Sequence, residues 1–147
     1  MYRVIQLTNQ AVGAVAAGSL LPLGAITRRY GCKGTAVPTF EVSTTGADTV
    51  TITEEGYYRI TYNGSLTGAA AGDLIVNLLA NGAEVISAMQ TSTANGVNNI
   101  SLSYIVRVLP NCFAVANNSP VTIQLQLDAE SVALAGGMSN IIIEKER

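Results

Sequence analysis

Alternation of apolar and polar residues marks several short segments of the chain as strands. In residues 121–127 (VTIQLQL) the alternation is complete, which places the four apolar side chains on one face. Residues 100–108 repeat this period of two, and so do residues 58–62 (YRITY). The β-branched residues 49–53 (TVTIT) and the apolar residues 140–144 fit the same kind of half-buried strand.

Turn residues separate these segments. Asn81-Gly82 lies between two strand-like runs at 74–80 and 84–88, and Asn-Gly is a strong hairpin signal. Further turns are predicted at Asn95-Gly96 and Gly136-Gly137. No extended run combines the apolar spacing of a helix with helix caps. About eight to ten short strands therefore predict an all-β sandwich or barrel with a single core.

The composition indicates a surface that other protein chains cover. Charged residues make up only 12% of the 147 residues, roughly half the usual fraction, and the net charge is -2. Residues 4–27 carry no charged side chain, and residues 85–127 carry only Arg107. Desolvating a hydroxyl or an amide costs far less than desolvating a charge, so such stretches suit an interface between subunits. The alternative is a neutral exterior, rich in Thr and Asn, that stays in contact with water.

The N-terminal part contains the longest apolar stretch. Residues 11–26 (AVGAVAAGSLLPLGAI) are shorter than the ~20 residues that cross a bilayer, and they include glycines and a proline. They also lack the positive segment that begins a signal peptide. We expect this stretch to pack tightly against another subunit or against the sheet, without insertion into a membrane. The expected route is assembly in the cytoplasm rather than export.

The residues available for chemistry argue against an enzyme. The chain has no histidine, which removes the commonest general base and metal ligand. Asp128 and Glu130 could begin a calcium site, but no Asp-x-Asp cluster supplies the remaining oxygens. Cys32 and Cys112 are either two free thiols or one disulfide, within or between chains. We expect no catalytic residue, cofactor or metal, and no nucleic-acid partner, since no basic and aromatic stripe is present.

Residues 54–62 (EEGYYRITY) carry a family pattern. The turn glycine, the aromatic residue after it and the alternating aromatic and aliphatic strand resemble the central strand of the tumour-necrosis-factor-like and complement-globular-head jelly rolls. Spore-surface glycoprotein heads and phage head-fibre or appendage modules belong to the same broad group. The expected strands follow the same order over residues 36–144. Two features depart from the family: residues 117–120 read NNSP where many relatives have a Gly-Asp turn, and no collagen-like stalk is present.

The resemblance implies a jelly-roll sandwich of about ten antiparallel strands that forms a homotrimer. Residues 36–147 would form the jelly roll, and residues 1–35 an N-terminal strand with docking and trimer contacts, within one globular unit. The two central strands have apolar residues on both faces, as an interface requires, although isolated exposed hydrophobes are common. The expected trimer interface consists of Tyr57, Tyr62, Tyr104 and Ile105. The expected docking residues are apolar residues of the N-terminal part: Val4, Ile5, Leu7, Leu20, Leu21, Leu23 and Ile26.

Together these features predict a structural protein of a phage virion, a trimeric jelly roll that decorates the capsid or builds a head fibre or appendage. Its other partners would be capsid or tail proteins. One alternative is a tip protein that binds a receptor or a host-surface glycan, with spare aromatic residues such as Tyr30 and Phe40 stacking on the sugar. A head domain on a spore or cell surface is a further alternative.

Overall fold

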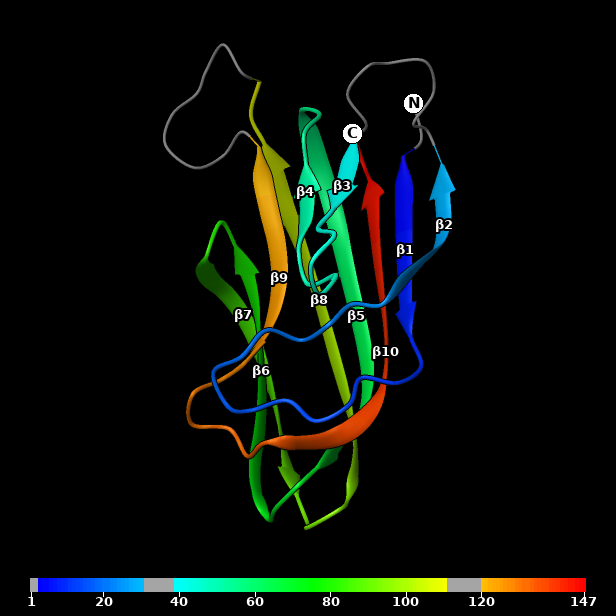
Figure 1. The fold of residues 1–147 in the computed structure, drawn as a ribbon. Coiled ribbons are helices and arrows are strands. Elements are labelled where there is room, and N and C mark those ends of the chain that lie inside the picture. Colours follow the sequence, from blue (N-terminus) through cyan, green and yellow to red (C-terminus); the bar gives the residue numbers. More distant parts are fainter. Residues whose placement is uncertain (1–2, 31–38, 111–119) are drawn as a thin grey trace.

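The computed structural model describes residues 3–30, 39–110 and 120–147, and within these ranges every regular element is a strand. Ten strands form two antiparallel sheets of five strands each, which face each other as a sandwich (Figure 1). The predicted all-β architecture with about ten strands is confirmed. No helix among the described residues is long and apolar enough to cross a membrane. Cys32 and Cys112 lie outside the described ranges, so their pairing stays a prediction.

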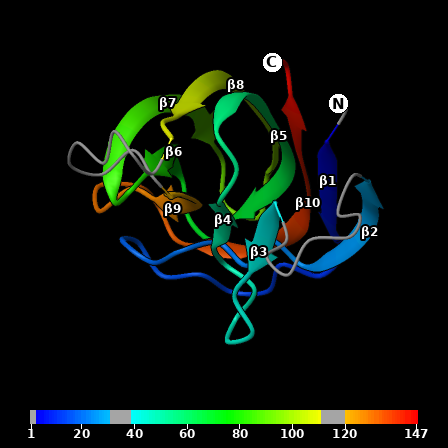
Figure 2. The same cartoon turned by 90° about the horizontal axis from the view of Figure 1, so that it is seen from above.

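Most connections lead from a strand of one sheet to a strand of the other sheet, as in a jelly roll. Viewed from above, the strands of one sheet lie along one side of a shared interior and those of the other sheet along the opposite side (Figure 2). Sheet A consists, in spatial order, of β2 (Ala25–Tyr30), β1 (Val4–Asn9), β10 (Leu134–Lys145), β5 (Gly56–Gly68) and β8 (Val97–Val108). Sheet B consists of β3 (Phe40–Val42), β4 (Val50–Ile52), β9 (Val121–Leu127), β6 (Gly72–Ala80) and β7 (Ala83–Ser92).

The core consists of the inward positions of the alternating strands. All four apolar residues of β9 are buried, and the three polar residues between them are half-buried. Phe40 of β3 packs edge-on against Tyr58 of β5, with 5.8 Å between the ring centroids. Each fully buried large side chain of this kind contributes about 1.5–3 kcal/mol. Because the ring of Phe40 is fully buried, Phe40 is a core residue and not the sugar-stacking residue suggested by the sequence.

Residues 10–24 form a strap between β1 and β2 that crosses the lower half of the sandwich (Figure 1). The strap extends sheet B by hydrogen bonds to β9, although it forms no regular strand itself. β4 pairs only with residues 121–123 of β9. The second half of β9 instead bonds to the strap, where the Leu21 amide donates to the Leu125 carbonyl oxygen at 2.8 Å and the Leu127 amide donates to the Ser19 carbonyl oxygen at 2.9 Å. The strap therefore satisfies backbone groups that an incomplete sheet would leave unpaired.

This arrangement corrects most of the expected docking residues. β1 pairs with β10 in the interior of sheet A, and the strap packs into the same core. Described residues 3–30 therefore belong to the same sandwich as the rest of the chain, and no structural boundary separates them from it. The N-terminal part is apolar because it completes the fold of its own chain. Five of the expected docking residues are at most 4% exposed, namely Val4, Ile5, Leu7, Leu21 and Leu23. Only Leu20, which is half-buried, and Ile26, which is 41% exposed, remain accessible.

Gly24 allows the strap to turn into β2. Its φ of +91° lies in the region that favours glycine, and a Cβ at this position would lie 2.3 Å from the Thr8 carbonyl oxygen. Gly13 of the same strap also has a positive φ, but no atom lies within 4 Å of its Cβ position. Of these two glycines, only Gly24 is required by a close approach of the strap to β1.

We expect Leu21→Ala to lower the free energy of unfolding by about 2–5 kcal/mol, because it leaves a cavity in the core. Leu20→Ala is the matched control at the neighbouring, half-buried position, where about 1 kcal/mol or less is expected. Urea denaturation followed by circular dichroism measures both values. Equal, small losses in the two variants would show that the strap is a docking arm and does not belong to the core.

Candidate functional site

On strands β1, β10, β5 and β8, the outward face of sheet A carries three successive rows of residues without a charge, and Arg28 of β2, which pairs with Gln6, lies at the margin of the first row. Ile60 and Tyr62 of β5 and Ile141 of β10 face the core, so the residues between them on each strand point outward. The strand registers align these outward residues across the sheet. The first row holds Gln6, Ile142, Thr61 and Ser103, the second holds Thr8, Asn140, Asn63 and Ser101, and the third holds Met138, Ser65 and Asn99.

Side-chain hydrogen bonds join neighbouring strands across this face. The amide of Gln6 donates to Oδ1 of Asn140 at 2.8 Å, and the hydroxyl of Thr8 donates to the same oxygen at 3.3 Å. The hydroxyl of Ser101 donates to Oδ1 of Asn63 at 2.9 Å. Because these polar groups already bond to each other, another chain can cover the face at a lower desolvation cost.

A hollow of about 440 Å³ lies across the second and third rows. Met138, which is 55% exposed, lines this hollow together with Gly64, Ile100 and a set of hydroxyl and amide side chains. No charged or nucleophilic group with a base beside it lines the hollow. Among the residues that the structure describes, no cluster of three His, Cys, Asp or Glu side chains could hold a metal ion. The hollow can therefore receive a neutral, partly apolar surface, but it offers no groups for acid–base catalysis.

On β1, β10, β5 and β8, the charges of this face lie at its upper end, close to the C-terminus. The guanidinium of Arg107 lies over the ring of Tyr57, 5.5 Å from its centroid, and Tyr57 is 43% exposed. Arg59 forms an ion pair with Glu146 at 2.7 Å, and this carboxylate raises the pKa of Arg59. Ile105, beside Arg59 in the register, is 46% exposed. The upper end thus combines exposed apolar groups with charges that are already paired.

The edge formed by β7 and β8 is the second apolar surface. These are the last strands of their sheets, and they contact each other along the same side of the sandwich. Edge strands usually carry charges that prevent association, but β7 has only Glu84 and β8 only Arg107. Val97 and Met89 are 67% and 58% exposed at this edge. This side of the sandwich therefore combines exposed apolar groups with few charges.

The structure places the four expected interface residues in different environments. Tyr57 and Ile105 lie on the outward face, as the sequence suggested. Tyr104 is half-buried and lines a hollow of about 290 Å³ near the upper end of the β7–β8 edge. Tyr62 is only 1% exposed, and burial raises the pKa of its hydroxyl to about 12. Tyr62 is therefore a core residue, and this member of the expected interface is corrected.

Sequence reasoning missed three exposed hydrophobic residues. The exposure of Val97 could have been predicted. An even number of positions separates it from Ile105, so both lie on one face of the strand, whereas the buried residues Ile100 and Leu102 lie on the other. Met138 lies on the same face of its strand as Asn140 and Ile142, but the run of three isoleucines at 141–143 does not reveal from the sequence which of the two faces is buried. The strand containing Met89 lacks clear alternation.

Asp128 and Glu130, which the sequence suggested as the start of a calcium site, belong to no cluster of three acidic side chains among the described residues. Oδ1 of Asp128 accepts a hydrogen bond from the Asn77 amide at 2.8 Å, and Oδ2 accepts one from the backbone amide of Glu130 at 2.9 Å. The bond from Asn77, with the backbone bond, lowers the pKa of Asp128. This carboxylate holds the turn that follows β9.

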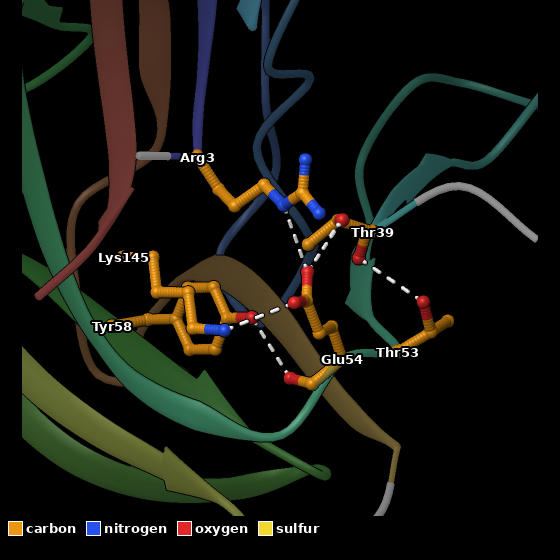
Figure 3. Close-up of polar contacts among 6 residues, drawn as sticks. All are labelled: Arg3, Thr39, Thr53, Glu54, Tyr58 and Lys145. Atoms are coloured by element: carbon orange, nitrogen blue, oxygen red, sulfur yellow. Dashed lines mark hydrogen bonds and ion pairs between the residues drawn. The ribbon is translucent and has the colours of Figure 1, made fainter. Parts of the chain in front are cut away.

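Glu54 connects the two ends of the chain (Figure 3). Its carboxylate accepts hydrogen bonds from Nε of Arg3 at 3.0 Å, from Nζ of Lys145 at 3.0 Å and from the Thr39 hydroxyl at 2.9 Å. Tyr58 donates to the Glu54 backbone oxygen at 2.8 Å. With its oxygens engaged in this way, the carboxylate is a structural clamp and not a general base.

The clamp determines the charge state of Glu54. Partial burial by itself raises the pKa of Glu54, but the bonds from Lys145, Thr39 and Arg3 outweigh this effect, and the pKa lies below its ordinary value. A carboxyl group whose pKa is lowered by folding stabilises the folded state above its unfolded pKa, and this contribution disappears as the pH falls through the folded pKa. The clamp therefore stabilises the protein at neutral pH and loses this effect in acid.

We expect Glu54→Gln to reduce the free energy of unfolding at pH 7 by roughly 1–3 kcal/mol, because two largely buried cations lose their counter-charge. Glu55→Gln, at the exposed neighbouring position, is the matched control and should change it by less than about 0.5 kcal/mol. Denaturation curves between pH 7 and pH 3 provide the measurement. The difference between the wild type and Glu54→Gln should shrink as the pH falls below 4, and a difference independent of pH would contradict the clamp.

Solved structures share this architecture. The chain is similar to Eiger TNF from S. frugiperda (10% identity, TM-score 0.68, covering 100% of this chain and 92% of the other). It is also similar to the globular domain of zebrafish complement 1qA protein (10% identity, TM-score 0.64, 97% and 94%). A third similar structure is PRD1 vertex protein P5 (17% identity, TM-score 0.63, 99% and 97%). No protein-family model and no curated protein matches the sequence.

The chain therefore has the jelly-roll fold of tumour-necrosis-factor and complement-1q globular heads, and the resemblance read from residues 54–62 is confirmed at the level of fold. The similarity extends over almost the whole length of each chain, strap and β1 included. At such low sequence identity the shared feature is the fold, and function must be argued from the surface of this chain.

Proposed function

We propose that the protein is a structural, self-assembling jelly roll that forms a homotrimer. The observation that carries this proposal is the outward face of β1, β10, β5 and β8, which combines three uncharged rows, side-chain hydrogen bonds between neighbouring strands and the exposed Met138. A monomer has no need for such a face, since charged side chains there would improve solubility. Such a face suits an interface, because covering an uncharged surface with another chain costs little desolvation energy.

The proposed contact joins the β7–β8 edge of one protomer to the outward face of sheet A of the next. Val97 pairs with Thr67 of β5, and Met138 pairs with Ser65, so the edge residue and the hollow lie at nearly the same level along the strands. A rotation about an axis parallel to the strands then joins the two surfaces without a shift along them. Because the two surfaces differ, the contact is head-to-tail, and such contacts form a closed ring when the rotation closes. We propose a ring of three.

The proposed role is to decorate or extend a virion. The face and the hollows described above provide binding surfaces and no catalytic group, which supports a structural role and not an enzymatic one. The fold shared with PRD1 vertex protein P5 supports a location on a particle. In this proposal the partners are further copies of the chain and capsid or tail proteins, joined during assembly in the host cytoplasm.

We expect Met138→Lys to weaken trimer formation at least tenfold, because a desolvated ammonium in the covered hollow costs more than ~1.4 kcal/mol. Thr44→Lys adds the same charge at an exposed position between β3 and β4 and is the matched control. Light scattering at micromolar concentration should give three times the mass of 15.3 kDa for the wild type and for Thr44→Lys. A monomeric wild type, or a Met138→Lys protein that remains fully trimeric, would refute the proposed interface.

The location on a particle has a separate test. Capsid, portal or tail genes beside the gene of this protein would support a virion component, whereas spore-coat genes would favour a spore-surface head. Saturable binding of a defined glycan on an array would favour the tip protein that binds a receptor or sugar.

A further inference from the structure

β2 is an edge strand whose two faces are both exposed. It is the outermost strand of sheet A and pairs with β1 on one side, and no described strand pairs with its other edge. All six of its residues are exposed, including Ile26 at 41% and Tyr30 at 60%. Figure 1 shows β2 at the margin of the molecule, beyond β1. A strand of a sandwich usually buries one face, so β2 extends sheet A beyond the cover that sheet B provides.

β2 also carries the only two adjacent basic residues of a chain whose net charge is negative. Arg29 donates to the Phe40 carbonyl oxygen, so its guanidinium anchors β2 to β3. Arg28 is exposed, and its side chain forms no ion pair or hydrogen bond with the residues that the structure describes. The two other arginines on the outward face of sheet A, Arg59 and Arg107, contact Glu146 and Tyr57 respectively. Arg28 therefore remains available to a negative group from outside the chain.

We propose that the outer edge of β2 binds an extended acidic segment of a partner protein, which adds to sheet A as a further strand. Main-chain hydrogen bonds would supply the pairing, a carboxylate would lie beside Arg28, and an apolar side chain would cover Ile26. The six residues of β2 match the usual length of a strand. This inference rests on the proposed function, since it names the surface and the partner chemistry by which the assembly attaches to a particle.

Charge argues against a second copy of this chain as the occupant. If two β2 edges paired antiparallel about their centres, Arg28 of one copy would lie opposite Thr27 of the other and diagonally across from its Arg29 on the same face, within reach of a long side chain. Like charges at neighbouring cross-strand positions destabilise a sheet. The arginines thus oppose pairing between identical copies and favour an acidic segment at the same edge. This surface is also distinct from the β7–β8 edge, which lies at the opposite end of sheet A.

The test uses a fluorescein-labelled peptide of seven alternating Val and Glu residues as the probe, with the native wild-type assembly. A peptide of the same charge in which every second Val is replaced by Pro cannot form a strand and is the first control. Fluorescence anisotropy should show saturable binding of the alternating peptide and at least tenfold weaker binding of the proline peptide. Amide hydrogen exchange of residues 25–30 should slow when the alternating peptide is bound.

Variants locate the binding. Arg28→Glu and Arg28→Ala should each weaken binding of the alternating peptide at least tenfold, and circular dichroism verifies that both variants are folded. Arg147→Glu makes the same change in net charge at an exposed position of the C-terminus and should leave the affinity within twofold of the wild type.

Three outcomes would overturn the inference. Equal binding of both peptides would show attraction by charge without strand addition. Unchanged binding by the Arg28 variants would place the site elsewhere. No binding at millimolar peptide would show that the arginines only protect the edge from self-association. Each outcome is independent of the proposed trimer, because the mass of the assembly is measured separately, and a monomer that still binds the peptide would refute the trimer alone.

Discussion

The structure depends on the pairing of β1 with β10, which brings the two ends of the chain together in the interior of sheet A. Six residue pairs, from Val4 with Glu144 to Asn9 with Ser139, form this contact. The pairing places Ile5 and Leu7 beside Ile143 and Ile141 in the core, where all four are at most 1% exposed. It positions β2 at the margin of the same sheet, and it begins the strap that completes β9. The clamp at Glu54 holds the ends of both strands with ionic hydrogen bonds.

The two faces of sheet A serve different physical purposes. The inward face is a continuous apolar layer that holds the sandwich together. On β1, β10, β5 and β8, the outward face joins several of its polar side chains to each other and carries its charges at one end. A face of this kind lowers the desolvation cost of a contact and gives the contact a direction, since the charged end cannot be exchanged with the neutral end.

Much of the fold could be predicted from the sequence because its strands alternate strictly. In β9 and β8 the period of two assigned each side chain to a face, and Asn81-Gly82 located the hairpin between β6 and β7. The candidate site was predictable only in part. Tyr57 and Ile105 were found from their parity, whereas Tyr62 was assigned to the interface although it shares the parity of the buried Tyr58 and Ile60.

The N-terminal part shows where sequence reasoning stops. Residues 4–27 are uncharged, and this property suits a docking arm and a buried strap equally well. The distinction depends on β9, a strand about 100 residues away whose second half has no partner in β4. Hydrogen bonding between segments this far apart leaves no local pattern in either one. For the same reason the exposure of β2 follows from the extent of sheet B and not from its own six residues.

By itself the sequence determined that this protein is an all-β sandwich with a charge-poor exterior and no histidine chemistry, because composition and a period of two are local properties of the chain. Only the tertiary structure decided which apolar residues are core and which are surface in the N-terminal part, at Tyr62 and at Met138. That decision depends on which strands lie side by side, and long-range pairing between β1 and β10 and between the strap and β9 determines it.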